Sequence, residues 1–377
     1  MRERPILTIS LVILFVTIKL QFHAQTDTNY WHYHELIYKA ECVMFDSNKN
    51  VEQGFQYYDQ AFNNFEFNYL HDLVNAAQLA HYYHRDYMKY LKKAVGYGLH
   101  PANLNFIPVW QEQTVVQEFL DYFQSAEGQA VRKQYLSTIN QDYLAWLYQL
   151  SLTELKYRRS SDEHYREHFT QWDQDLLAKI NEYGFPGARL VGVDDPTLYR
   201  DLQNKQLDYN GFVKRGSDSL CLPPNTALIP CVMSEGDTLW MSILDTNWSC
   251  PEMDYVYLSQ SLLMLYVVHH SCPMKIFLAV YDEIAKGNLH PREYTYMLDN
   301  SHVAEQECDC EKYSRQFFRI GNYNQEMIFK NYFLPEDETD ALRKQYWIVP
   351  LRVERAKEQF GAEHGYRFNW GMNNCYK

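Results

Sequence analysis

The sequence lacks a concentration of positive charge. Its 377 residues carry a formal net charge of −13 at pH 7, and no run of lysines and arginines stands out. Nucleic-acid binding needs a concentrated basic surface, because the phosphates supply much of the affinity. We therefore expect no nucleic-acid partner, and no attachment to an anionic membrane surface.

Catalytic signatures are absent as well. The chain has no Gly-x-Ser-x-Gly turn, phosphate-binding loop, paired-glycine dinucleotide turn or His-Glu-x-x-His sequence. These absences favour a protein that binds without catalysis, and they predict no cofactor.

Long apolar runs are missing except at the N-terminus. There, "MRERP" carries two arginines and precedes the 13-residue run "ILTISLVILFVTI", and Ala24 stands at a plausible cleavage point. This layout is typical of a secretory signal peptide, and the run is short for a membrane span. We predict a signal peptide over residues 1–24 and an exported protein, periplasmic or secreted, without stable membrane insertion after cleavage. An uncleaved anchor is the alternative, because Phe22 lies where a small residue is preferred.

Eight cysteines are present, and seven of them lie in the C-terminal half. Export to an oxidising compartment favours disulfides, although the sequence does not define their connectivity. The disulfide candidates are Cys221, Cys231, Cys250, Cys308, Cys310 and Cys375. Cys308 and Cys310 are also candidate metal ligands, but no second pair stands at zinc-finger spacing.

Apolar residues recur at helical spacing through most of the chain. Residues 30–100 predict two helix pairs whose second members align at an offset of 33 residues. The aligned residues are Phe55 with Met88, Tyr57 with Tyr90, and Ala61 with Ala94. This period resembles tetratricopeptide-type helical hairpins, and an ordinary bundle of αα-hairpins is the alternative.

The remaining segments complete a mainly α prediction. Residues 101–146 form a helical connector, and residues 147–357 form a helical domain with a small irregular or β insertion at 198–253. Residues 358–377 form an irregular tail. One helical pattern runs from about Glu127 to Arg159, and a later helix ends just before Gly184.

Four phrases stand in order within residues 147–357: "LLAKINEYGFPGARLVG", "YVVHHSCPMKIFLAVYDEIAKGNLHPREYTYMLDN", "RIGNYN" and "LPEDETDALRKQYWIVPLRVERAK". Together they resemble the bacterial domain-of-unknown-function family DUF 6624. Trp347 and Ile348 stand where that family has Gly-Leu. The resemblance implies a helical domain and no particular reaction.

Two adjacent histidines are the foremost candidates for chemistry. His269 and His270 end the apolar stretch of "YVVHHSCP", and His270 continues its buried stripe. His270 is a candidate general base or metal ligand, with Asp299 or Glu283 as the orienting carboxylate. The structural interpretation, which we favour, is an imidazole that caps the helix, because the free carbonyls there attract a donor.

Asp194 completes the binding candidates beside His269 and His270. It lies in "VGVDDP", where a carboxylate pair is able to hold a cation, although Asp-Asp-Pro usually forms a simple turn. The leading hypothesis is an exported helical scaffold that binds a protein or peptide. The alternative is a hydrolase with its centre at His270.

Overall fold

Helices make up most of the part of the chain that the structure describes. The computed structural model describes residues 29–46, 49–111, 114–147, 149–150, 165–193, 229–232, 238–241, 274–300, 318–319 and 334–368. The elements are, in chain order, α2 (Tyr30–Phe45), α3 (Val51–Asn64), α4 (Leu70–Tyr82), α5 (Met88–Val95), the 3-10 helix η1 (Pro101–Phe106), α6 (Pro108–Gln111), α7 (Val115–Gln124), α8 (Ala126–Thr138), α10 (Tyr165–Tyr183), α11 (Ala188–Val191), β1 (Ile229–Val232), β2 (Thr238–Met241), α15 (Met274–Ala285), α16 (Pro291–Asn300), α17 (Glu336–Gln345) and α18 (Leu351–His364). The mainly α prediction is confirmed.

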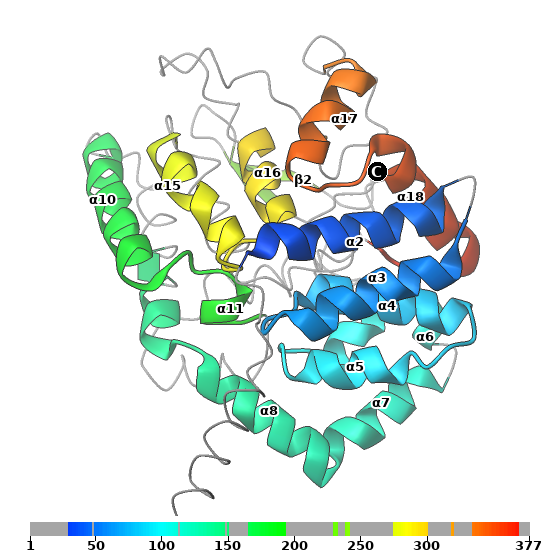
Figure 1. The fold of residues 1–377 in the computed structure, drawn as a ribbon. Helices are drawn as coiled ribbons and strands as arrows, with labels where there is room; N and C mark the ends of the chain where they lie inside the picture. The colour runs from blue at the N-terminus through cyan, green and yellow to red at the C-terminus, as the bar shows by residue number, and fades with distance from the viewer. Residues whose placement is uncertain are drawn as a thin grey trace, which may run out of the picture.

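Helix α2 packs between the N-terminal and the C-terminal helices that the structure describes. Figure 1 shows it crossing the middle of the molecule, with α3, α4 and α5 on one side and α15, α16 and α17 on the other. It packs against α3 next in sequence and also against α15 and α18. Its predicted stripe is buried as expected, from Tyr33 through Ile37 to Met44. The N-terminal helices and the C-terminal segment therefore share one hydrophobic core.

Helix α4 lies at the centre of this core. Every residue from 70 to 80 is buried, including four polar ones: His71, Asp72, Asn75 and Gln78. A helix that is buried on all sides needs partners for its polar side chains, because an unpaired buried polar group is costly. The side chains of these four residues must therefore find their polar partners on the segments that surround α4.

The predicted helix pairs at 30–100 are present as α2–α3 and α4–α5. The second members of the pairs contact each other through their side chains. The rings of Phe55 and Tyr90 stack with their centroids 6.4 Å apart, and the Tyr90 hydroxyl donates a hydrogen bond of 2.8 Å to Asp59. These contacts agree with stacked helical hairpins, and the tetratricopeptide assignment itself stays a prediction.

The long helical pattern expected from Glu127 onwards is interrupted. Helix α8 ends at Thr138, and Ile139 is extended. The Asn140 side chain accepts a hydrogen bond of 2.9 Å from the Tyr143 N–H and begins a new helical turn. The Asn140 N–H donates to the carbonyl of Leu190 at 2.8 Å. An asparagine that caps a helix in this way outweighs the continuing apolar pattern.

A predicted helix end is confirmed further along the chain. Helix α10 ends at the predicted place, where Gly184 has φ +96°, a conformation that glycine adopts without strain. Pro291 is the first residue of α16, where its missing N–H costs nothing. Within the predicted insertion, β1 and β2 pair antiparallel, with Cys231 opposite Leu239. In the part of the chain that is described, no helix is long and apolar enough to cross a membrane.

Candidate functional site

Most of the predicted site residues lie outside the described residues. This holds for His269, His270, Asp194, and the pair Cys308 and Cys310. Of the disulfide candidates, Cys231 alone lies in a described element, the strand β1. Among the described residues no disulfide is present and Cys42 is a free thiol, whose pKa burial raises to about 11. No group of three or more metal-ligating side chains occurs among them either.

The two candidate carboxylates have structural partners. Glu283 is 2% exposed and accepts hydrogen bonds from the Phe185 N–H at 2.7 Å and from the Asn288 side chain at 2.8 Å. It also pairs with Lys286 at 2.5 Å. Asp299 accepts a bond of 2.8 Å from the Phe318 N–H. Glu283 thus connects α15 to the turn after α10, which is a structural role and not a catalytic one.

Replacing Glu283 tests this structural role. We expect Glu283→Ala to lower the free energy of unfolding by about 3 kcal/mol, because a buried N–H and a charged hydrogen bond lose their partner. Glu283→Gln keeps an acceptor oxygen and should lose less. Urea denaturation measures both. Asp282→Ala, an exposed neighbour on α15, is the control and should change stability by no more than about 0.5 kcal/mol. Equal stability of Glu283→Ala and wild type would contradict the role.

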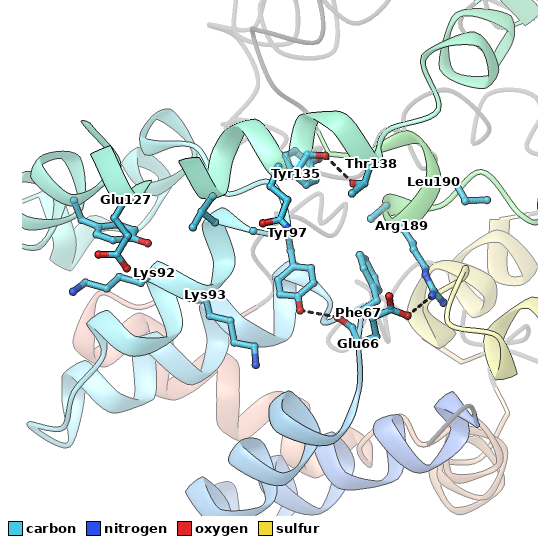
Figure 2. Close-up of a pocket in the computed structure, with 15 residues that line it drawn as sticks. Glu66, Phe67, Lys92, Lys93, Tyr97, Glu127, Tyr135, Thr138, Arg189 and Leu190 are labelled. Carbon is cyan, nitrogen blue, oxygen red and sulfur yellow. Dashed lines mark hydrogen bonds and ion pairs between the residues drawn. The ribbon is translucent and has the colours of Figure 1, made fainter. Parts of the chain in front are cut away.

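An open groove lies between α5, α8 and α11. Its volume is about 740 Å³, and its lining combines aromatic and charged side chains. Figure 2 shows Lys92 and Glu127 at one end and Arg189 with Glu66 at the other, while Tyr97 lies between the ends. This volume falls in the range usual for ligand sites.

Some of the polar groups in the groove are already committed. The Tyr97 hydroxyl donates to the Glu66 carbonyl at 2.8 Å, and the Arg189 guanidinium lies 3.2 Å from the Glu66 carboxylate. Tyr135 accepts a bond of 3.0 Å from the N–H of Val193. These bonds hold the walls of the groove in place.

Other polar groups in the groove are available to a ligand. The Lys92 ammonium lies 5.0 Å above the ring of Tyr122. Within the described ranges, the side chains of Lys92, Glu127 and Gln134 make no hydrogen bond or ion pair with the protein. A cation, a carboxylate and an amide thus face the same open space.

A second candidate is a buried ionic cluster beside α4. The Lys357 ammonium donates to Glu41 at 2.8 Å and lies 3.8 Å from Glu354, with all three side chains almost fully buried. Glu354 also accepts hydrogen bonds from Arg292 and, at 2.9 Å, from Arg343. Burial opposes the ionisation of Glu41, but Lys357 and Arg292 outweigh it and hold the pKa of that carboxyl below its usual value.

Three histidines and one aspartate adjoin this ionic cluster. The rings of His34 and His290 meet edge to face with their centroids 4.9 Å apart. The Nε2 atom of His290 lies 3.6 Å from the Asp72 carboxylate, which also accepts a bond of 3.0 Å from Tyr33. The Nε2 atom of His71 contacts the side-chain amide of Asn75, which stands one turn further along α4, at 3.1 Å.

Burial controls the protonation of these groups. It lowers the pKa of His34 and His290 well below the ordinary value, and it brings the pKa of His71 to about 4. It raises the pKa of Asp72 to about 6. At neutral pH the three histidines are therefore uncharged and Asp72 is largely ionised.

The cavity at this cluster is small. Its volume is about 10 Å³, room for about one water molecule. The walls on one side are Trp347, Ile348 and Val349. Trp347 has φ +53°, a strained conformation for a bulky residue. No substrate of ordinary size fits this cavity.

The buried cluster left only a faint signal in the sequence, namely charged residues on apolar helical stripes. Glu41 follows Ile37 by four positions in α2, and Lys357 follows Val353 by four positions in α18. The groove left no signal in the sequence, because its lining comes from five separate segments of the chain.

Comparison with known proteins adds no assignment. No family model matches the chain, and no curated protein or solved structure shows detectable similarity to it. The resemblance to DUF 6624 therefore stays a prediction.

Proposed function

We propose that this chain is an exported helical binding protein that holds a peptide segment in the groove between α5, α8 and α11. The observation that carries the proposal is the open space of about 740 Å³ into which Lys92, Glu127 and Gln134 present uncommitted polar groups.

A peptide matches the chemistry of this lining. Its amides pair with Gln134, its acidic groups with Lys92 and its basic groups with Glu127, while Tyr97 and Tyr122 offer ring surface. Mixed charge favours a mixed-charge ligand over a nucleic acid or another polyanion. The buried histidine cluster supports the non-catalytic hypothesis, since its cavity of about 10 Å³ admits no substrate. The hydrolase hypothesis centred on His270 remains the alternative.

Filling the groove is the direct test. Gln134 is exposed on α8 and lines the groove, so Gln134→Trp fills the space without removing a buried contact. A phage-displayed library of random peptides is selected on the wild-type chain, and Kd values of the enriched peptides follow from fluorescence anisotropy. We expect Gln134→Trp to raise Kd at least tenfold, because the added ring occupies the volume of the peptide.

Lys133→Trp is the matched control. Lys133 is exposed on the same helix but does not line the groove, and its replacement should leave Kd unchanged. Enriched peptides that bind both variants equally well, or a selection that enriches none, would refute the proposal.

A further inference from the structure

The buried cluster connects elements from opposite ends of the chain. Lys357 of α18 binds Glu41 of α2, and Arg292 of α16 binds Glu354 of α18. His290, the residue before α16, faces Asp72 of α4. Each of these contacts joins segments that are far apart in sequence or lie on different helices, so the cluster lies where those helices meet.

His290 is held in one protonation state by its bonds. Its Nδ1 atom accepts a hydrogen bond of 3.1 Å from the Arg292 N–H, as a capping side chain does at the start of a helix. In the neutral ring the proton therefore lies on Nε2, which faces Asp72 at 3.6 Å. A second proton would have to enter at Nδ1, where it meets the Arg292 N–H and removes the cap of α16.

His34 offers no better place for a proton. Its side chain is 2% exposed, and its Nε2 atom has no hydrogen-bond partner among the described residues. Its nearest titratable neighbour is the His290 ring. A charge on His34 would thus be buried beside a second imidazole instead of a carboxylate.

We propose that this cluster is an acid-sensitive latch: neutral His34 and His290 keep α2 and α4 docked on α16 and α18, and protonation of the two rings releases the contact. Opening allows each imidazole to take its proton in water, and the Arg292 N–H then loses its acceptor.

Titratable and charged groups surround the two rings. They are Tyr33 and Glu41 from α2, Tyr69 at the start of α4, His71 and Asp72 from α4, Arg292 and Glu293 from α16, and Lys357 from α18. Glu354 of α18 in turn pairs with Arg292, Lys357 and Arg343 of α17. The carboxylates of Glu41 and Glu354 are engaged by Lys357, Arg292 and Arg343. The Asp72 carboxylate lies 3.6 Å from the His290 ring, while Glu293 accepts a hydrogen bond of 3.2 Å from the His290 backbone N–H. The pKa of Asp72, about 6, means that this carboxylate loses its charge as the pH falls.

The pH dependence of the opening equilibrium follows from the number of protons that the open form binds in excess of the closed form. The ordinary pKa values are 6.5 for histidine and 3.8 for aspartate. Between pH 6 and pH 4, opening adds a proton to each of His34, His71 and His290, whose pKa values are lowered in the closed form. It removes one from Asp72, whose pKa is raised. The net uptake of two protons increases the opening equilibrium about 100-fold per pH unit.

Hydrogen–deuterium exchange of the full chain, read by mass spectrometry from pH 7.5 to 4, tests the latch. After correction for intrinsic exchange, we expect α2 and α16 to lose protection about 100-fold per pH unit below pH 6. Helices α5 and α8, which do not touch the cluster, should stay protected to lower pH. Loss of protection in all helices at the same pH, or none down to pH 4, would overturn the proposal.

Variants in which the two histidines are replaced by side chains that cannot take up a proton supply the control. His290→Asn keeps an acceptor for the Arg292 N–H, and His34→Phe keeps a ring against its neighbours. The double variant leaves one proton taken up and one released, so protection of α2 and α16 should become nearly independent of pH. His32→Gln, on the more exposed side of α2, should behave as wild type. An unchanged pH dependence in the double variant would overturn the latch. If that variant does not fold, the order of exchange in the wild type alone decides.

Discussion

Replacing Lys357 with methionine is expected to lower the free energy of unfolding by about 3–5 kcal/mol, because it leaves a buried charge without its partner. The Lys357 ammonium is fully buried and lies 2.8 Å from Glu41. Methionine preserves much of the aliphatic volume, so the loss reports the electrostatic contact. Urea denaturation at pH 7.5 measures it.

A second substitution separates charge from packing. In Lys357→Met with Glu41→Gln, no unpaired carboxylate remains at that position, and we expect at least half of the lost stability to return. Arg352→Met is the matched control on the same helix. Its ion pair with Asp46 is solvent-exposed, and such pairs contribute about 0–1 kcal/mol. Additive losses in the double variant would contradict the pairing.

Arg343→Met is expected to cost about 3–5 kcal/mol, because Glu354 and two carbonyl oxygens lose a charged donor in the interior. The guanidinium is 0% exposed and donates to Val349 O at 2.7 Å, Phe318 O at 2.6 Å and Glu354 at 2.9 Å. It thereby holds the segment that follows Trp347 against the cluster.

Arg343→Lys keeps the charge but not the planar fork. A single ammonium cannot reach three acceptors in fixed directions, so we expect this variant to lose at least half as much stability as Arg343→Met. Urea denaturation of both variants shows whether the stability depends on the planar geometry of the guanidinium or on its positive charge alone. A lysine variant as stable as wild type would show that the charge alone matters.

Structural features that depend only on neighbouring residues could be predicted from the sequence. The buried stripe of α2 and the end of α10 before Gly184 depend on spacing and backbone chemistry within a few positions. The break before Asn140 was missed, because the continuing apolar pattern masked the asparagine cap, and the Leu190 carbonyl that also holds Asn140 lies 50 positions later in the chain. The same limit explains why Arg343, although it belongs to a quoted phrase, carried no predicted role.

Local spacing and glycine were enough to predict the buried stripe of α2 and the end of α10, because such features arise within a few residues. The environment of the charged residues depends instead on segments that meet only in the folded chain. Glu41 and Lys357 are 316 positions apart and meet at 2.8 Å. His34 and His290 are uncharged because folding removes water from both rings. Burial and pairing are properties of the folded interior, and no local pattern encodes them.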